Sequence, residues 1–342
     1  MFERIIEKEI VEAIKSLVAE AGKIVVLGHQ NPDGDALGSV LGFAEWTRLY
    51  GKEPVMVLPD AFPDFLQWLP KSNEILRYDK KPDEVERAMG KADLLVCVDF
   101  NVYSRVDAME PVLRNFRGKV IHIDHHIGPA INAQVVVSDD KASSASELVF
   151  KIVWEAGDFP KLGRLFHVPV FTGLMTDTGT FEYASAGPDC FHIVAELLKT
   201  GIDKAKIHRN VYDTYSLWRL RLQGYVLNRK LKVYPKLHAS YFALTKEELQ
   251  QFHFMKGDAD GLVNLPLQLK GHQLSISLRE DTVRENVVWV SARSAGEFAC
   301  NTFCAKYYNG GGHKNASGGR LDCSIEEAIR ITEEAISLIN NE

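Results

Sequence analysis

The sequence predicts an α/β fold in two domains: an N-terminal parallel sheet with helices on both faces, and a smaller C-terminal α+β domain. The chain has 342 residues, and a domain typically has about 100–200. Over residues 1–200, short apolar runs alternate with helical patterns. Continuously apolar strands that are separated by helices are typical of a parallel sheet covered on both faces. From about residue 238 this alternation gives way to strands and a glycine cluster.

The N-terminal elements follow from hydrophobic periodicity. An amphipathic pattern over residues 2–20, with Ile6, Ile10 and Ile14 at helical spacing, predicts an opening helix. Apolar runs predict strands at Lys23–Gly28, Val55–Leu58, Leu94–Val98 and Val120–Ile123. Helical patterns predict further helices at Ala36–Tyr50, Ala145–Ala156, Val168–Met175, Cys190–Thr200 and Asp203–Tyr212.

The C-terminal elements are more mixed. Strands are predicted at Ala239–Leu244, Gln273–Leu278 and Val287–Ser291, and helices at Glu297–Lys306 and Ser324–Asn340. We therefore expect a first domain over residues 1–215, a connector over 216–237, and a second domain over 238–342.

Composition excludes several classes of protein. Hydrophobic residues make up 46% and charged residues 25% of the chain, as in soluble globular proteins. No apolar run approaches the roughly 18–20 residues of a membrane span. The five cysteines include no C-x-x-C pair, which favours a reducing cytoplasmic location. A net charge of −6 disfavours long duplex nucleic acid as a partner, because such binding needs a basic face.

Polar residues follow the predicted strands, where an open α/β sheet binds its ligands. They occur in His29–Asp35, at Asp99, in Asp124-His125-His126, and in Thr176–Gly179 after an apolar segment. Each group alone has a simpler interpretation as a helix cap, a polar turn or a helix end. Together they supply six nitrogen and oxygen donors: His29, Asp33, Asp35, Asp99, His125 and Asp177.

Six such donors predict a two-metal site. Clustered carboxylates repel one another and take up protons unless cations neutralise them. The mixture of imidazole and carboxylate suits Mn²⁺, Fe²⁺, Zn²⁺ or Mg²⁺. Two ions roughly 3.5–4 Å apart, bridged by one carboxylate, account for the whole set.

These motifs resemble the DHH phosphoesterase superfamily, which takes its name from the triplet found here at residues 124–126. The H-x-x-x-D-x-D motif begins at His29, and the segment Gly310–Gly318, preceded by Ser291–Ser294, resembles the associated DHHA1 domain. The resemblance spans residues 20–330. Within the superfamily, the chain is similar to the bacterial oligoribonuclease/pAp phosphatase group, also called the nanoRNase type.

The resemblance implies a manganese-preferring dinuclear centre. One ion would be held by His29, Asp33 and Asp99, and the other by Asp35, Asp99, His125 and Asp177. His126 would lie near the scissile phosphate, while Asp124 would orient a histidine.

The substrate-binding residues are expected in the second domain, with one pair in the first. Backbone amides can come close to an anion at Gly310, Gly311 and Gly312, because glycine has no side chain. His313 and Arg293 add cationic donors. Ser143 and Ser144 either cap a helix or contact phosphate.

The expected activity is metal-dependent hydrolysis of phosphoester bonds by a metal-activated water. The expected substrates are short oligoribonucleotides (nanoRNA, pApA) and 3′-phosphoadenosine 5′-phosphate (pAp), in the manner of an exoribonuclease and nucleotide phosphatase. The alternative is a cyclic di-AMP/pApA phosphodiesterase, and a third possibility is a nucleotide-binding module that has lost catalysis. The resemblance also makes a homodimer plausible.

Overall fold

The structure is a computed structural model that describes residues 2–213, 215–255 and 257–339. The chain divides into two compact units, Met1–Thr214 and Tyr215–Glu342. Within the described residues, no helix is both long enough and apolar enough to cross a bilayer.

The first unit contains a six-stranded sheet in the order β3-β2-β1-β4-β5-β6. Its strands are β1 (Ile24–Leu27), β2 (Val55–Leu58), β3 (Leu76–Arg77), β4 (Leu94–Val98), β5 (Lys119–Asp124) and β6 (Val135–Ser138). Every neighbouring pair is parallel, which confirms the predicted parallel sheet. The edge strands β3 and β6 were not predicted, because the first has two residues and the second is only partly buried.

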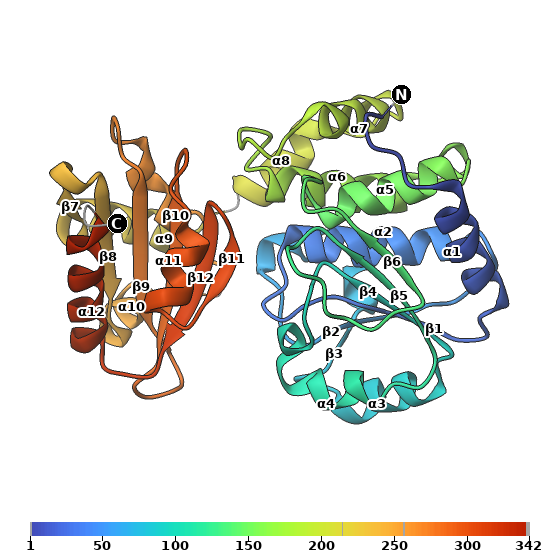
Figure 1. Ribbon diagram of the computed structural model, residues 1–342, viewed down its shortest axis with the longest axis horizontal. Helices are drawn as coiled ribbons and strands as arrows, with labels where there is room; N and C mark the ends of the chain where they lie inside the picture. The colour runs from blue at the N-terminus through green and yellow to red at the C-terminus, as the bar shows by residue number, and fades with distance from the viewer. Residues whose placement is uncertain (1, 214, 256, 340–342) are drawn as a thin grey trace. The chain divides into compact units, whose positions relative to one another are not determined.

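Helices cover both faces of this sheet (Figure 1). One face carries α1 (Lys8–Glu20), α2 (Gly34–Arg48), α5 (Ala145–Glu155) and α6 (Arg164–Asp177), and the other carries α3 (Pro82–Lys91) and α4 (Glu110–Arg114). Alternate strand residues serve the two faces: Val26 and Val96 pack in the first core, and Val25 and Leu95 in the second. Beyond α5 and α6 lie α7 (Pro188–Lys199) and α8 (Lys204–Tyr212).

The sequence predicted an opening helix from residue 2, but α1 begins at Lys8. Residues before it form a non-helical segment that is held by other contacts. The Phe2 ring packs 5.6 Å from the Trp154 ring, and the amides of Glu3 and Arg4 donate to Asp189. These contacts replace the backbone hydrogen bonds of a first helical turn.

The second unit contains a mixed sheet in the order β11-β12-β10-β9-β8-β7. Its strands are β7 (Lys232–Tyr234), β8 (Ala239–Leu244), β9 (Leu274–Glu280), β10 (Val288–Ser294), β11 (Gly311–His313) and β12 (Ala316–Leu321). Only β8 and β9 pair in parallel among these described strands. The glycine cluster that was expected between two helices is therefore part of the sheet.

Helices α11 (Cys300–Tyr307) and α12 (Ile325–Ser337) pack on one face of the second sheet. The other face carries α9 (Leu217–Tyr225) and α10 (Lys246–Gln251). The segment expected as a connector, residues 216–237, contains α9, a π-helical turn at Val226–Lys230, and β7. In this structure it is an integral part of the second unit.

Candidate metal centre

The candidate donors meet where the strand order of the first sheet reverses. His29 lies just after β1, Asp99 just after the adjacent β4, and Asp124 is the last residue of β5. The carboxyl ends of parallel strands at such a reversal form the crevice in which this kind of sheet binds ligands. The parallel arrangement of these strands thus brings residues that are distant in sequence close together.

Asp99 is central to this cluster. Its Oδ2 lies 3.3 Å from Nε2 of His29, and its Oδ1 lies 3.3 Å from Nε2 of His125. The backbone of Asp99 has a φ of 65°, in the left-handed region that few residues other than glycine and asparagine or aspartate adopt. Its amide donates to the carbonyl of Ile123 on β5. Asp99 is therefore held between two groups of donors.

The first group consists of His29, Asp33 and Asp99, whose ligand atoms lie within 4.8 Å of one another. Asp33 is also the N-cap of α2, where its Oδ1 accepts hydrogen bonds from the amides of Asp35 and Ala36. The same Oδ1 lies 3.9 Å from Nε2 of His29. The capping interpretation and the metal-ligand interpretation of Asp33 are therefore compatible.

The second group consists of Asp35, His125 and Asp177. Nε2 of His125 lies 3.7 Å from the Oδ2 of each aspartate. Asp177 is the last residue of α6, so it lies at the end of the predicted helix and not at the end of a strand. The apolar run before Asp177 is part of this helix, which begins at Arg164 and ends beside His125.

Asp35 is anchored by the start of α5. Its Oδ2 accepts a hydrogen bond from the amide of Ala145 at 2.6 Å, and its Oδ1 accepts one from the amide of Ser146 at 2.9 Å. A helix N-terminus stabilises a carboxylate because its first amides have no partner within the helix. Sequence reasoning missed this anchor, since α2 and α5 are remote in the chain.

The two glycines Gly38 and Gly173 allow α2 and α6 to approach closely. A Cβ on Gly38 would lie 2.7 Å from the carbonyl oxygen of Pro169, and one on Gly173 would overlap the side chain of Ser146. The sequence signal for this contact was a glycine inside each predicted helix, where glycine costs stability unless packing requires it.

The electrostatics of the cluster are those of crowded carboxylates. Burial, together with the charge of Asp99, raises the pKa of Asp35 well above its ordinary value. Burial likewise raises the pKa of Asp177 to about 6. Burial acts in the same direction on Asp99, but hydrogen bonds from His125 and His29 outweigh it and hold the Asp99 pKa well below its ordinary value.

For the two buried histidines, His29 and His125, burial and nearby charge act on the pKa in opposite directions. Burial acts to lower the pKa of His125, but the hydrogen bond and charge of Asp99 and the charge of Asp177 raise it well above its ordinary value. The pKa of His29 is raised too, where Asp99 outweighs burial and the charge of Arg105. The raised pKa values of the histidines and of Asp35 both reflect the concentration of negative charge that a bound cation would neutralise.

His126 is oriented by Asp124. Nδ1 of His126 lies 2.8 Å from Oδ1 of Asp124 and 3.8 Å from Oδ1 of Asp99. Asp124 is fully buried, and its Oδ2 has no hydrogen-bond partner within the described part of the chain. An unpartnered carboxylate oxygen beside Asp99 and His126 is a further sign that this cluster lacks positive charge.

The donor set fits a divalent cation. His29, Asp35, Asp99 and His125 are buried, while Asp177 and His126 are partly exposed and Asp33 is exposed, so the cluster is open on one side. Mixed imidazole and carboxylate donors are the ligands of the harder first-row ions and Mg²⁺. Asp99 belongs to the first group and also lies 3.3 Å from His125 of the second, as a carboxylate that bridges two ions requires.

Ser143 and Ser144 make hydrogen bonds at the start of α5, as expected if they cap this helix. Ser144 is the N-cap of α5 and accepts a hydrogen bond from the amide of Glu147, while the Ser143 hydroxyl donates to the Glu147 carboxylate at 2.6 Å. Both serines are buried. Their hydroxyls are therefore occupied by the first turn of the helix.

In the second unit, Arg293 and His313 lie in one row of the sheet. Both are paired with Ala316, Arg293 from β10 and His313 from β11. Residues directly opposite one another in antiparallel strands point to the same face, and strands two apart are separated by about 10 Å. The two side chains therefore project from the same face, across β12.

The glycines next to His313 have a structural function in the hairpin. A Cβ on Gly310 would collide with the backbone of Gly318, and Gly312 has a φ of 138°. The amide of Gly310 donates to the carbonyl of Cys304, so this amide is already paired. Gly311 is exposed and has open space around it.

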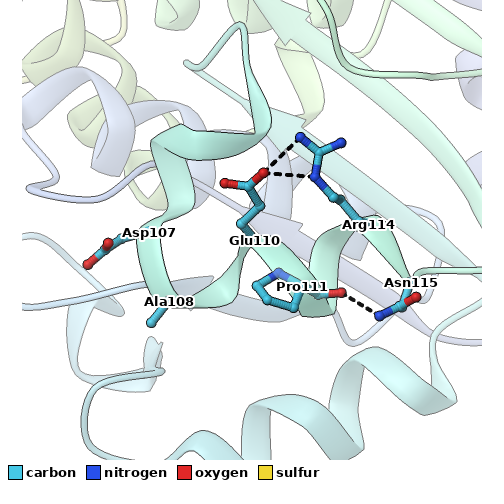
Figure 2. Close-up of a pocket in the computed structure, with 6 residues that line it drawn as sticks. All are labelled: Asp107, Ala108, Glu110, Pro111, Arg114 and Asn115. Atoms are coloured by element: carbon cyan, nitrogen blue, oxygen red, sulfur yellow. Dashed lines mark hydrogen bonds and ion pairs between the residues drawn. The ribbon is translucent and has the colours of Figure 1, made fainter. Parts of the chain in front are cut away.

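A surface depression elsewhere in the first unit contains none of the predicted residues. Figure 2 shows it at the start of α4 and the preceding 3₁₀ segment η3 (Tyr103–Met109), where Glu110 pairs with Arg114 and the carbonyl of Pro111 accepts from Asn115. Its two charged helix residues neutralise one another. We assign no function to this depression.

The chain is similar to known proteins over most of its length. Residues 23–170 match the model of the DHH family, N-terminal domain. The chain is 32% identical over 327 residues to a Thermus thermophilus protein named bifunctional oligoribonuclease and PAP phosphatase NrnA, covering 94% of this chain and 91% of the relative. A crystal structure of an exopolyphosphatase-related protein from Bacteroides fragilis has a TM-score of 0.92 and 40% identity, with 98% of each chain covered.

A further relative is longer than this chain. The chain is 27% identical to the cyclic-di-AMP phosphodiesterase GdpP of Geobacillus thermodenitrificans, over 97% of its own length but only 50% of that protein.

Fold, site and relatives together define a metal-dependent phosphoesterase. More particularly, the chain belongs to the DHH family.

Proposed function

We propose that this enzyme hydrolyses phosphoester bonds in short oligoribonucleotides and in pAp. The observation that carries the proposal is the position of Asp99 between two buried histidines. Its Oδ2 lies 3.3 Å from Nε2 of His29, and its Oδ1 lies 3.3 Å from Nε2 of His125. The name of the Thermus thermophilus relative, which the chain matches over nearly its full length, supports these substrates.

The site would hold two divalent ions, for which we propose Mn²⁺. His29, Asp33 and Asp99 would hold one ion, and Asp35, Asp99, His125 and Asp177 the other. When bound, the ions supply a water of lowered pKa and stabilise negative charge on the phosphoryl oxygens. The backbone amides that hold Asp35 keep this carboxylate in place without a cation.

His126 would contact the phosphate that is cleaved. Its hydrogen bond to Asp124 fixes the ring with the hydrogen on Nδ1, which leaves Nε2 as the atom that exchanges a proton. Asp124 is a positioning residue, because it acts on the substrate through the histidine. Charge on the imidazole would be stabilised by the same carboxylate.

Arg293 and His313 would bind the part of the substrate that is not cleaved. They project from one face of the second sheet, and a guanidinium binds a terminal phosphate through two parallel hydrogen bonds. A substrate held in this way needs a phosphate other than the one that is cleaved. Short substrates with a terminal phosphate are therefore favoured.

The test is a comparison of substrates under one condition. We would incubate the enzyme and Mn²⁺ with pApA, pAp, cyclic di-AMP and RNAs of two to five nucleotides. An Asp99→Asn variant and a chelated sample serve as controls. Fast cleavage of pApA and short RNA, together with release of phosphate from pAp, is the expected result. No turnover of any of them would contradict the proposal and would favour a nucleotide-binding module.

Cyclic di-AMP is the second candidate substrate. The similarity to the Geobacillus phosphodiesterase, which extends over 97% of this chain, favours it. Cyclic di-AMP has no terminal phosphate, so Arg293 would have no such group to bind. If cyclic di-AMP is cleaved faster than pApA, and the Arg293→Gln variant cleaves it as fast as the wild type does, the cyclic substrate is the physiological one.

A further inference from the structure

A second pocket lies in the first unit, at the start of α6. Its volume is about 700 Å³, within the range of pockets that hold small ligands. The lining residues come from the segment after the 3₁₀ helix η1 (Asp64–Leu66), from the 3₁₀ helix η4 (Phe159–Lys161), from the segment between α7 and α8, and from the first turns of α6 and α8. None of the six candidate metal ligands is among them, and Asp177 lies at the other end of α6.

The start of α6 offers unpaired amides to this pocket. The N-cap is Gly163, which has no side chain, and no side chain of the described residues accepts a hydrogen bond from the first amides of the helix. The helix has 14 residues, so its N-terminal dipole is well developed. Such an end favours an anion.

Two cations flank the same helix end. Arg164 and Lys206 line the pocket, both are exposed, and neither side chain has an ion-pair partner within the described residues. Asp203 is the one carboxylate among the lining residues, and its Oδ1 accepts a hydrogen bond from the amide of Lys206 as the cap of α8. Two positive side chains therefore face one negative side chain that is already engaged.

Two buried polar groups of the lining have no partner. The side chain of His167 is 94% buried, since 6% is exposed, and no described atom forms a hydrogen bond with its Nε2. The indole Nε1 of Trp68 is likewise buried and unpaired. Nearly all buried polar groups in proteins are hydrogen-bonded. These two atoms therefore leave two hydrogen-bonding groups available to a ligand in this pocket.

We propose that this pocket binds a phosphate group, either as free phosphate or as the phosphate of a nucleoside monophosphate. The helix amides, Arg164 and Lys206 supply the charge that a phosphate dianion requires. Burial lowers the pKa of His167, so the neutral imidazole contributes a hydrogen bond rather than a charge. Trp68 and Phe159, which also line the pocket, provide aromatic surface for a nucleobase.

The test is a titration that reports on Trp68 itself. The full chain, loaded with diamagnetic Mg²⁺ and labelled with ¹⁵N on its indoles, is titrated with inorganic phosphate and, separately, with AMP. A Trp68→Phe variant identifies the resonance of Trp68. We expect this resonance to shift until it saturates. Half-saturation at a lower concentration of AMP than of phosphate identifies the nucleotide as the ligand, and equal values identify free phosphate.

Variants then separate a site from a general effect of salt. An Arg164→Gln/Lys206→Gln variant is expected to bind at least about tenfold more weakly, because each lost contact involves a charged group. Arg209→Gln changes an exposed arginine of α8 outside the lining and is expected to bind as the wild type does. A shift that chloride reproduces, or equal affinity in the double variant, would overturn the proposal. Because the readout is binding at Trp68, failure here is distinct from failure of the proposed activity.

Discussion

Oδ1 of Asp99 lies 3.3 Å from Nε2 of His125. Its other oxygen, Oδ2, lies 3.3 Å from Nε2 of His29. A carboxylate that serves two groups of donors in this way is what joins two metal positions into one site.

Asp99→Asn should abolish most of the activity. The amide keeps the shape of the side chain but loses its charge and one acceptor, so both metal positions are weakened. Metal ions supply several kcal/mol to the transition state, so turnover should fall on the order of a thousandfold. Turnover of pApA and bound metal per chain would both be measured.

The matched control for this variant is Asp107→Asn. Asp107 is exposed and also has a positive φ, of 46°, which asparagine adopts as readily as aspartate. We expect this control to retain normal activity and normal metal content. Equal losses in the two variants would show that Asp99 has no special position.

Asp124→Asn should lower kcat about 10–100-fold and leave KM nearly unchanged, because Asp124 acts through the orientation of His126. The hydrogen bond of 2.8 Å between the two side chains would be replaced by one to an amide, which allows the wrong tautomer. A shifted pH profile of kcat is the signature of this effect. Asp140→Asn, at an exposed position, is the control, and a rise in KM alone would contradict the assigned function of Asp124.

Gly38→Ala should destabilise the first unit by about 1–3 kcal/mol, because the added methyl group must displace the backbone of α6. That methyl would lie 2.7 Å from the Pro169 carbonyl oxygen. Activity should fall as well, since α2 carries Asp35 and α6 carries Asp177. Urea unfolding and turnover of pApA would measure the two effects.

Gly90→Ala is the control for a helical glycine without such a neighbour. It lies in α3 with no atom within 4 Å of an added Cβ. Alanine there should stabilise the protein by at most about 1 kcal/mol. If Gly38→Ala behaved in the same way, the close packing of α2 on α6 would not be required.

The stability of the first unit should depend on pH through Asp158. Burial acts to raise the pKa of Asp158, but hydrogen bonds from Lys161, Tyr50 and Trp46 outweigh it and hold the pKa below its ordinary value of 3.8. A lowered folded-state pKa means that the stabilisation is present above 3.8 and is lost as the pH falls through the folded-state pKa. The sign is therefore a loss of stability in acid.

The variant Asp158→Asn tests this dependence. It should lose about 1–3 kcal/mol at pH 7, and its difference from the wild type should shrink below about pH 4. Urea unfolding at several pH values, followed by tryptophan fluorescence, measures the difference. Asp213→Asn, at an exposed position, should show no difference at any pH. A difference for Asp158→Asn that grows in acid would contradict the account.

The sequence predicted the ligand cluster because its residues follow recognisable strands. His29, Asp99 and Asp124 each come directly after or at the end of a continuously apolar run, and parallel strands bring such ends together. Asp177 follows a helix that was predicted as Val168–Met175, but the predicted helix was too short at its start, because α6 begins at Arg164. Its helix is defined by contacts with α2.

Other features depend on tertiary structure and could not be predicted from local patterns. The anchoring of Asp35 by amides of α5 joins residues about 110 positions apart. The row shared by Arg293 and His313 depends on strand register through Ala316. The pocket at the start of α6 combines residues from separate segments that share no motif, and its basis is unpaired polar atoms such as Nε2 of His167.

The most direct test of the central claim is a metal titration of the chelated wild-type enzyme. Turnover of pApA and bound Mn²⁺ would be measured in the same samples as metal is added. If Asp99 bridges two positions, turnover should rise until two ions are bound per chain, and the Asp99→Asn variant should fail to reach that number. Full activity with one ion per chain, or two ions bound without Asp99, would contradict the account.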